Sequence, residues 1–350
     1  MKTWQKLKKD PKLFRRYFVK EYIISAARKF FEDRGYHELE SPIFAFALPQ
    51  ERYLDPFRTS IQLPNSRKEE VYIIPTTETY NKKILAAGLG EHFVISKVAR
   101  AMEDIGPNHS PEFTMLEWYH LNANYFDLMD DCENLLISMK QFVDEKLGRE
   151  FSLEFTYQEH SIDISPGWDR VDLSLALEEH CDIKLSDIQD HKNFAEIMKS
   201  KGYNINFKED WQTLFEWVFA SEIEGQFSSR RPTFVYNYPK QVCPLTKLNT
   251  ENPLVCEKVE LYIAGKEIAN GYTELRDWKE QKRRFKEEQA ARQKLGKRSI
   301  KFDYELIEAL RSGIPPVAGI GMGLDRLAMI FANTKSISDV NYFPAQEWFE

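Results

Sequence analysis

Three glutamates, Glu260, Glu267 and Glu274, are spaced seven residues apart beside an alternating apolar segment. On one helix this spacing would place them along an exposed stripe. The β-branched run 255–263 ends at Gly265, however, which predicts a strand, a turn and a second strand. Two adjacent strands would bring carboxylates together, and carboxylates that share a site require a cation.

A fourth carboxylate, Glu117, lies in the alternating segment 112–119 on the same face as Phe113 and Met115. A carboxylate among apolar neighbours is costly unless it has a cationic partner, which favours a ligand role. Glu78 follows a predicted strand at 71–75 and begins a predicted helix. It suits a substrate ammonium, but a capping carboxylate in the first helical turn explains it equally well.

A glycine-rich segment, 319–327, alternates glycines with apolar residues and continues into Arg326. The glycines remove the side chains from one strand face, so that a flat ligand can lie against the backbone. An arginine beside such a surface suits a nucleotide base or phosphate. The alternative is a closely packed strand-to-helix corner with a surface arginine.

Composition and charge are those of a water-soluble globular protein of 350 residues, with 42% hydrophobic residues and a net charge of −7. No segment approaches the roughly 20 apolar residues that span a bilayer. The basic N-terminus lacks the apolar stretch of a signal peptide, so we expect a cytoplasmic protein that does not engage membranes. The four cysteines are widely spaced, and we expect reduced thiols rather than a zinc site or disulfides.

The elements that position these residues are predicted from periodicity. A helical stripe covers 14–33 and a short strand follows at 36–40. Two strands within 93–119 flank a loop, and 232–238 is a further strand. Helical patterns dominate 120–230, at 125–147, 173–180, 193–201 and 211–221, and a charged helix covers 278–298. We expect one domain over 1–350 with a mostly helical insertion around 120–230.

Several segments resemble class II aminoacyl-tRNA synthetases. The segment PPVAGIGMGLDRLAMIF resembles their motif 3, and RGYHELESP resembles the end of motif 1, which forms the dimer interface in that family. The segments NHSPEFTMLEWY and VELYIAGKEIANGYTEL are similar to motif 2 and to the lysine-recognition segment of lysyl-tRNA synthetases. The resemblance implies an α+β fold, with a class II synthetase-like core of mainly antiparallel sheet flanked by helices.

The resemblance also implies roles for individual residues. ATP would be bound by Arg100, Glu103, Asn108, His109, Phe113, Gly323 and Arg326, of which Arg100, Glu103 and Arg326 would be catalytic. The amino acid would be bound by Glu78, Glu117, Tyr119, Asn270, Tyr272, Glu274 and Gly321, and Mg²⁺ by Glu260 and Glu267.

Motif 2 departs from the family pattern. Its usual F-R-x-E is replaced by Val98-Ala-Arg-Ala-Met-Glu103, and the segment is shorter than in the family. Either Arg100 has taken the role of the motif 2 arginine or the role is empty. A positioned arginine that stabilises developing phosphate charge contributes several kcal/mol.

The substrate class follows from the number of carboxylates. A diamino acid carries two ammonium groups, and Glu78 or Glu117 at one end and Glu274 at the other would pair with them. Only residues 1–13 precede the first predicted core helix, so we expect no N-terminal OB-fold domain and no anticodon recognition.

A stand-alone core of this kind resembles the elongation factor P lysine ligases. The resemblance implies a homodimer that activates lysine or (R)-β-lysine with ATP and Mg²⁺ and transfers it to a lysine of elongation factor P. Gly321 leaves room in the pocket, so the choice between lysine and β-lysine stays open. Two alternatives are a tRNA-independent or minimal lysyl-tRNA synthetase-like adenylating enzyme and a non-catalytic lysine-sensing paralogue.

Overall fold

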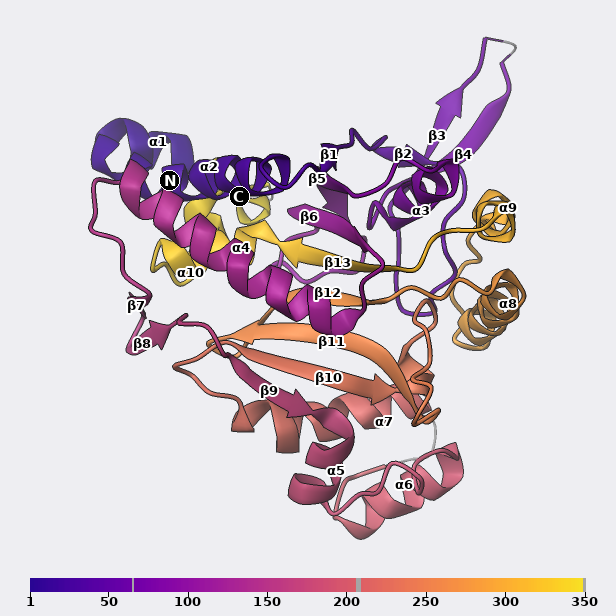
Figure 1. Ribbon diagram of the computed structural model, residues 1–350. Helices are drawn as coiled ribbons and strands as arrows, with labels where there is room; N and C mark the ends of the chain where they lie inside the picture. The colour runs from indigo at the N-terminus through magenta and orange to yellow at the C-terminus, as the bar shows by residue number, and fades with distance from the viewer. Residues whose placement is uncertain (65, 206–208, 349–350) are drawn as a thin grey trace.

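A large twisted sheet organises the computed structural model, which describes residues 1–64, 66–205 and 209–348 (Figure 1). Within those residues the sheet has eight strands. In spatial order they are β1 (His37–Glu38), β5 (His92–Ala99), β6 (Glu112–Leu121), β13 (Val317–Gly323), β12 (Lys266–Thr273), β11 (Val255–Ile263), β10 (Thr233–Pro239) and β9 (Asp169–Asp172).

The pairing is antiparallel from β5 through to β10, and only the outer strands β1 and β9 pair in parallel with their neighbours in the described sheet. This confirms the predicted α+β class and its mainly antiparallel sheet. β13, the last strand in the sequence, lies between β6 and β12 at the centre of the sheet.

One face of the sheet is covered by α2 (Phe14–Glu32), α4 (Tyr125–Lys146) and α10 (Leu324–Phe331). Figure 1 shows α2 and α4 side by side over this face. Leu116 and Trp118 of β6 are fully buried in the apolar core beneath these helices. Because strand side chains alternate, Phe113, Glu117 and Tyr119 point to the opposite face.

The remaining helices lie at the edges of the sheet. α3 (Glu78–Ala87), α8 (Trp278–Lys294) and α9 (Tyr304–Ser312) pack together at one side, near a small sheet of β2 (Phe44–Ala45), β4 (Lys68–Ile73) and β3 (Arg58–Gln62). α5 (Leu173–Cys181), α6 (His191–Ser200) and α7 (Trp211–Val218) pack beyond β10, and α1 (Thr3–Lys9) begins the chain (Figure 1).

The segment 120–230 is less uniformly helical than its pattern predicts. It also contains β7 (Glu154–Tyr157), β8 (His160–Asp163) and β9. Each has only four residues, too few for alternation to distinguish a strand, so periodicity does not reveal them. β7 and β8 pair with each other, whereas β9 extends the main sheet.

The expectation of four reduced thiols is wrong for one pair. Cys243 and Cys256 form a disulfide, while Cys132 and Cys181 are free and buried. The antiparallel pairing of β10 with β11 brings the two Cα atoms to 6.5 Å, although thirteen positions separate them in the sequence. Among the described helices, none is long and apolar enough to cross a membrane.

Candidate active site

A cavity of about 550 Å³ opens on the sheet face opposite α2 and α4. β6, β12 and β13 form its floor, and the loops at 51–55 and 242–246 form walls. It is lined by all the predicted site residues but one: Glu78, Arg100, Glu103, Asn108, His109, Phe113, Glu117, Tyr119, Glu267, Asn270, Tyr272, Glu274, Gly321, Gly323 and Arg326. The exception is Glu260, which lies behind the lining.

The glycines of β13 contribute no side chains to the floor of the cavity, and they lie beside the side chains of β6. Gly319 pairs with Tyr119 and Gly321 pairs with Glu117. A Cβ on Gly319 would lie 2.6 Å from Tyr119 Cε1 and 2.7 Å from Glu274 Oε1. Gly319 is therefore required by close packing against two predicted substrate-binding side chains, and sequence spacing alone does not single it out.

Glu117, predicted to bind the amino acid, is held in the cavity by three hydrogen bonds. It accepts hydrogen bonds from Thr76 Oγ1 at 2.7 Å, from Thr77 N at 2.8 Å and from Asn81 Nδ2 at 3.2 Å. Burial raises its pKa despite these donors. Among the described residues no cation forms an ion pair with it, so its charge is available to a ligand ammonium.

A buried lysine that sequence reasoning missed, Lys82, joins Glu78 and Glu274. Its Nζ lies 2.5 Å from Glu78 Oε1 and 2.6 Å from Glu274 Oε2, and Tyr272 donates a hydrogen bond of 2.8 Å to Glu78. Glu78 and Glu274 therefore meet at one ammonium and do not lie at opposite ends of the pocket, whereas the alternative, with Glu117 at one end and Glu274 at the other, stays a prediction. Lys82 follows Glu78 by one helical turn on α3, and this spacing was the available signal.

The nucleotide end contains the aromatic and basic residues. The guanidinium of Arg100 lies 5.3 Å from the centroid of the Phe113 ring. Arg326 donates to the carbonyl oxygens of Asn108 at 3.0 Å and Glu267 at 2.8 Å, so it ties the motif 2 loop to β12. His109 Nε2 lies 3.7 Å from Glu103 Oε1. Arg100 thus reaches the cavity despite the altered motif 2.

The proposed metal ligands lie on neighbouring strands. Burial and the charge of Glu260 raise the pKa of Glu267, against the opposing charge of Arg326. Glu260 already has local partners: Tyr238, Tyr262 and Asn270 donate hydrogen bonds to it, and Lys258 forms an ion pair of 2.8 Å.

The donor set suits Mg²⁺ held jointly with phosphates. No cluster of three or more His, Cys, Asp or Glu side chains that suits a metal occurs among the described residues. Mg²⁺ in nucleotide sites typically uses one or two carboxylates together with phosphate oxygens. Glu267 in the cavity, with Glu260 behind it, fits that pattern.

The wall at 51–55 brings in Glu51, a second residue that no sequence motif indicated. Burial and the charge of Glu78 raise its pKa to about 7, against the opposing effect of Arg100. Arg292 of α8 holds this wall by donating to the Arg52 and Leu54 carbonyls, at 3.3 and 3.1 Å, and by pairing with Asp55.

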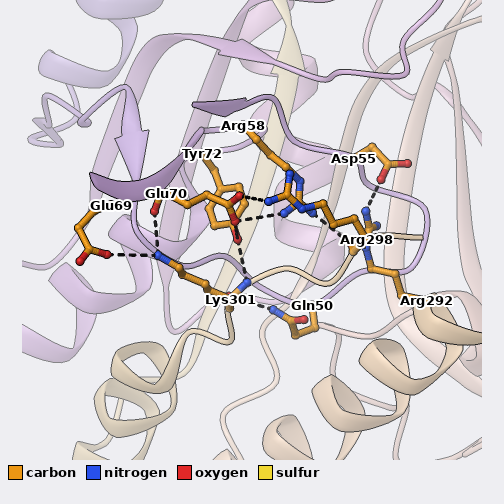
Figure 2. A network of polar contacts seen from close by, with 9 residues as sticks. All are labelled: Gln50, Asp55, Arg58, Glu69, Glu70, Tyr72, Arg292, Arg298 and Lys301. Carbon is orange, nitrogen blue, oxygen red and sulfur yellow. Dashed lines mark hydrogen bonds and ion pairs between the residues drawn. The ribbon is translucent and has the colours of Figure 1, made fainter. Parts of the chain in front are cut away.

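A polar network continues from this wall to the β3–β4 hairpin (Figure 2). Lys301 Nζ donates to the Glu70 carbonyl at 2.8 Å, and its backbone N–H donates to Tyr72 Oη at 3.0 Å. Arg58 donates to Glu70 Oε1 at 3.3 Å and to the Arg298 carbonyl at 3.1 Å. Gln50 donates to the Lys301 carbonyl at 3.3 Å, so the network reaches the residue that precedes this wall.

Comparisons with known proteins agree with this architecture. The family model described as tRNA synthetases class II (D, K and N) matches residues 2–347. Proteins named elongation factor P–(R)-β-lysine ligase from Salmonella paratyphi B, Salmonella schwarzengrund and Salmonella heidelberg are 32% identical over 342 residues. The match covers 97% of this chain and 97% of each relative. The chain belongs to the class II tRNA synthetases of the D, K and N type.

Proposed function

We propose that this protein activates a diamino acid, lysine or β-lysine, with ATP and transfers it to a lysine of elongation factor P. The observation that carries the proposal is the charge at the amino-acid end. Of the three buried carboxylates there, Glu78 and Glu274 contact one buried ammonium, Lys82, and Glu117 has no ion pair among the described residues. Three carboxylates beside one described cation leave room for the two ammonium groups of a diamino acid. The names of the Salmonella relatives support the choice of acceptor.

The reaction has two steps. The substrate carboxylate attacks the α-phosphate of ATP in line and displaces pyrophosphate, which yields an aminoacyl adenylate. The ε-amine of the acceptor lysine then attacks the acyl carbon, and AMP leaves. Catalysis of this kind depends on positioning and on neutralising charge, and it needs no nucleophilic side chain from the enzyme.

Each end of the cavity has its own task. Phe113 stacks on the adenine, while Arg100 and Arg326 neutralise phosphate charge. Glu103, Asn108, His109 and Gly323 complete the nucleotide end. Tyr119, Asn270 and Tyr272 orient the amino acid beside its carboxylates, with Gly321 in the floor. Glu267 with Glu260 would hold Mg²⁺, which would supply positive charge to the ATP phosphates.

The proposal extends to assembly and location. The protein acts as a homodimer in the cytoplasm, and α2 with the following strand β1 corresponds to the family segment that forms the dimer interface. The acceptor amine would enter through the open side of the cavity.

Amino-acid-dependent ATP–pyrophosphate exchange tests the activity. Lysine, (R)-β-lysine, ornithine, arginine and leucine are compared on the wild type, Glu274→Gln and Arg100→Ala, with the surface variant Glu305→Gln as control. We expect exchange with diamino acids only, lost in Glu274→Gln and lowered at least a hundredfold in Arg100→Ala, since a transition-state arginine contributes about 3–4 kcal/mol. Lysine binding without exchange would establish a sensor instead.

A second assay tests the acceptor. Purified elongation factor P is incubated with the enzyme, ATP and radiolabelled amino acid, beside a variant whose acceptor lysine is replaced by arginine. Label on the wild-type acceptor only is the expected result. Exchange without any transfer to elongation factor P would leave the adenylating activity and refute the acceptor.

A further inference from the structure

Lys82 is the most completely buried cation beside the cavity, with 0% of its surface exposed. It does not line the cavity itself; its Nζ approaches from behind the wall and contacts Glu78 and Glu274. The next residue, Lys83, points outward and pairs with Asp303 at 3.2 Å and Glu305 at 2.6 Å. One member of this lysine pair thus belongs to the site and the other to the surface.

The two oxygens of Glu274 face different surroundings. Oε2 contacts Lys82, whereas Oε1 lies over the bare backbone of Gly319, which lines the cavity. Glu274 is only 2% exposed. Burial and the charge of Glu78 raise the pKa of this carboxyl to about 8, although the Lys82 ammonium opposes them. Without Lys82, two adjacent buried carboxylates would share protons rather than both remain ionised.

We propose that Lys82 is a specificity-determining positioning residue, which holds Glu274 through Oε2 so that Oε1 stays turned toward the cavity, where it pairs with a second substrate amine and rejects apolar side chains. The inference rests on the proposed function. A carboxylate turned toward the cavity is left unpaired by an apolar side chain, and that loss disfavours the wrong substrate. A protonated Glu274 would accept an apolar side chain at much smaller cost.

Other charged and titratable groups also surround Lys82, and a pH experiment must separate their titration from that of Glu274. They are Glu78 on its own helix, Glu274 and Tyr272 from β12 and its end, Glu117 and Tyr119 from β6, and Glu51 from the wall. Burial alone would lower the pKa of Lys82, but Glu274 and Glu78 raise it above its ordinary value. Lys82 therefore stays charged while the carboxylates titrate.

The test measures selectivity rather than rate alone. The ratio of kcat/KM for lysine to that for norleucine is determined by pyrophosphate exchange between about pH 6 and pH 9, on the wild type, Lys82→Met, Lys82→Arg and the matched control Lys83→Met. We expect Lys82→Met to lower the ratio at least tenfold near pH 7 and to regain part of it at alkaline pH, where Glu274 ionises unaided. Lys82→Arg retains most of the ratio, and Lys83→Met keeps the wild-type ratio.

Removing one partner of a buried ion pair can prevent folding, so the double variant Lys82→Met/Glu274→Gln is made as well. It carries neither charge of that pair and is expected to accept norleucine at every pH tested. Lys82→Met could instead lose activity with lysine and with norleucine to the same extent and keep the wild-type ratio and pH profile. That result would overturn the assignment and leave Lys82 a purely structural residue. A wild-type protein without diamino-acid-dependent exchange would instead overturn the proposed function.

Discussion

Two glycines of β13 offer a matched pair of substitutions. A methyl group on Gly319 would lie 2.6 Å from Tyr119 Cε1, whereas a methyl group on Gly321 would lie 3.4 Å from Met115 Sδ. The first distance is a clash and the second is ordinary contact. Gly319→Ala is therefore expected to destabilise the protein, and Gly321→Ala is not.

The size of the effect follows from how little Tyr119 can move. It is 3% exposed, and its ring stacks on His92 with centroids 5.2 Å apart. Overpacking at such a position costs about 1–3 kcal/mol. The Met115 thioether beside Gly321 is flexible, so that variant should stay within about 1 kcal/mol of the wild type.

Thermal unfolding of the two variants and the wild type is the direct assay. At about 2.1 cal/mol/K of unfolding entropy per residue, one kcal/mol corresponds to about 1.4 °C for a 350-residue chain, so we expect Gly319→Ala to unfold about 1–4 °C lower and Gly321→Ala to differ by less. The KM for lysine should also rise in Gly319→Ala, because Tyr119 or Glu274 must shift to admit the methyl group. Equal unfolding temperatures for both variants would refute the packing argument.

Three further predictions concern the surroundings of the cavity. Phe113→Ala should raise the KM for ATP by about 5- to 150-fold and leave that for lysine unchanged, since stacking of one base contributes about 1–3 kcal/mol; exchange at varied ATP tests this. Burial alone would raise the pKa of Asp325, but Lys20, whose Nζ lies 2.6 Å away, lowers that pKa below its usual value. The pair therefore stabilises the protein at neutral pH. This contribution is lost as the pH falls through the lowered pKa of Asp325. Lys20→Met should therefore cost about 3–5 kcal/mol in urea unfolding at pH 7 and much less near pH 3, and a pH-independent difference would contradict this. Arg284 donates hydrogen bonds of 2.9 and 2.8 Å to two carbonyls of the 242–246 wall. The variant Arg284→Met should therefore have a higher KM for both substrates. Unchanged KM values would show that the wall keeps its position without Arg284.

Periodicity predicted the helix that became α2 and the strand that became β11, because long amphipathic segments carry a strong signal. The four-residue strand β9 carries no such signal and depends on pairing with β10. Lys82 and Lys83 are adjacent and chemically identical, so only the packing of α3 shows which one is buried. Glu51 enters the cavity for a similar reason, since its loop has no period and is positioned from α8.

The central place of β13 has a consequence for how the protein emerges from the ribosome. β6 is made early in the sequence and β12 much later, yet each needs β13, residues 317–323, as its neighbour. Until those residues are synthesised, both strands present unpaired backbone edges that invite pairing with other chains. The nascent chain therefore cannot assemble the cavity, or consume ATP in it, before residues 317–323 have been synthesised. Truncation just before β13 should yield an inactive and aggregation-prone product rather than a weaker enzyme.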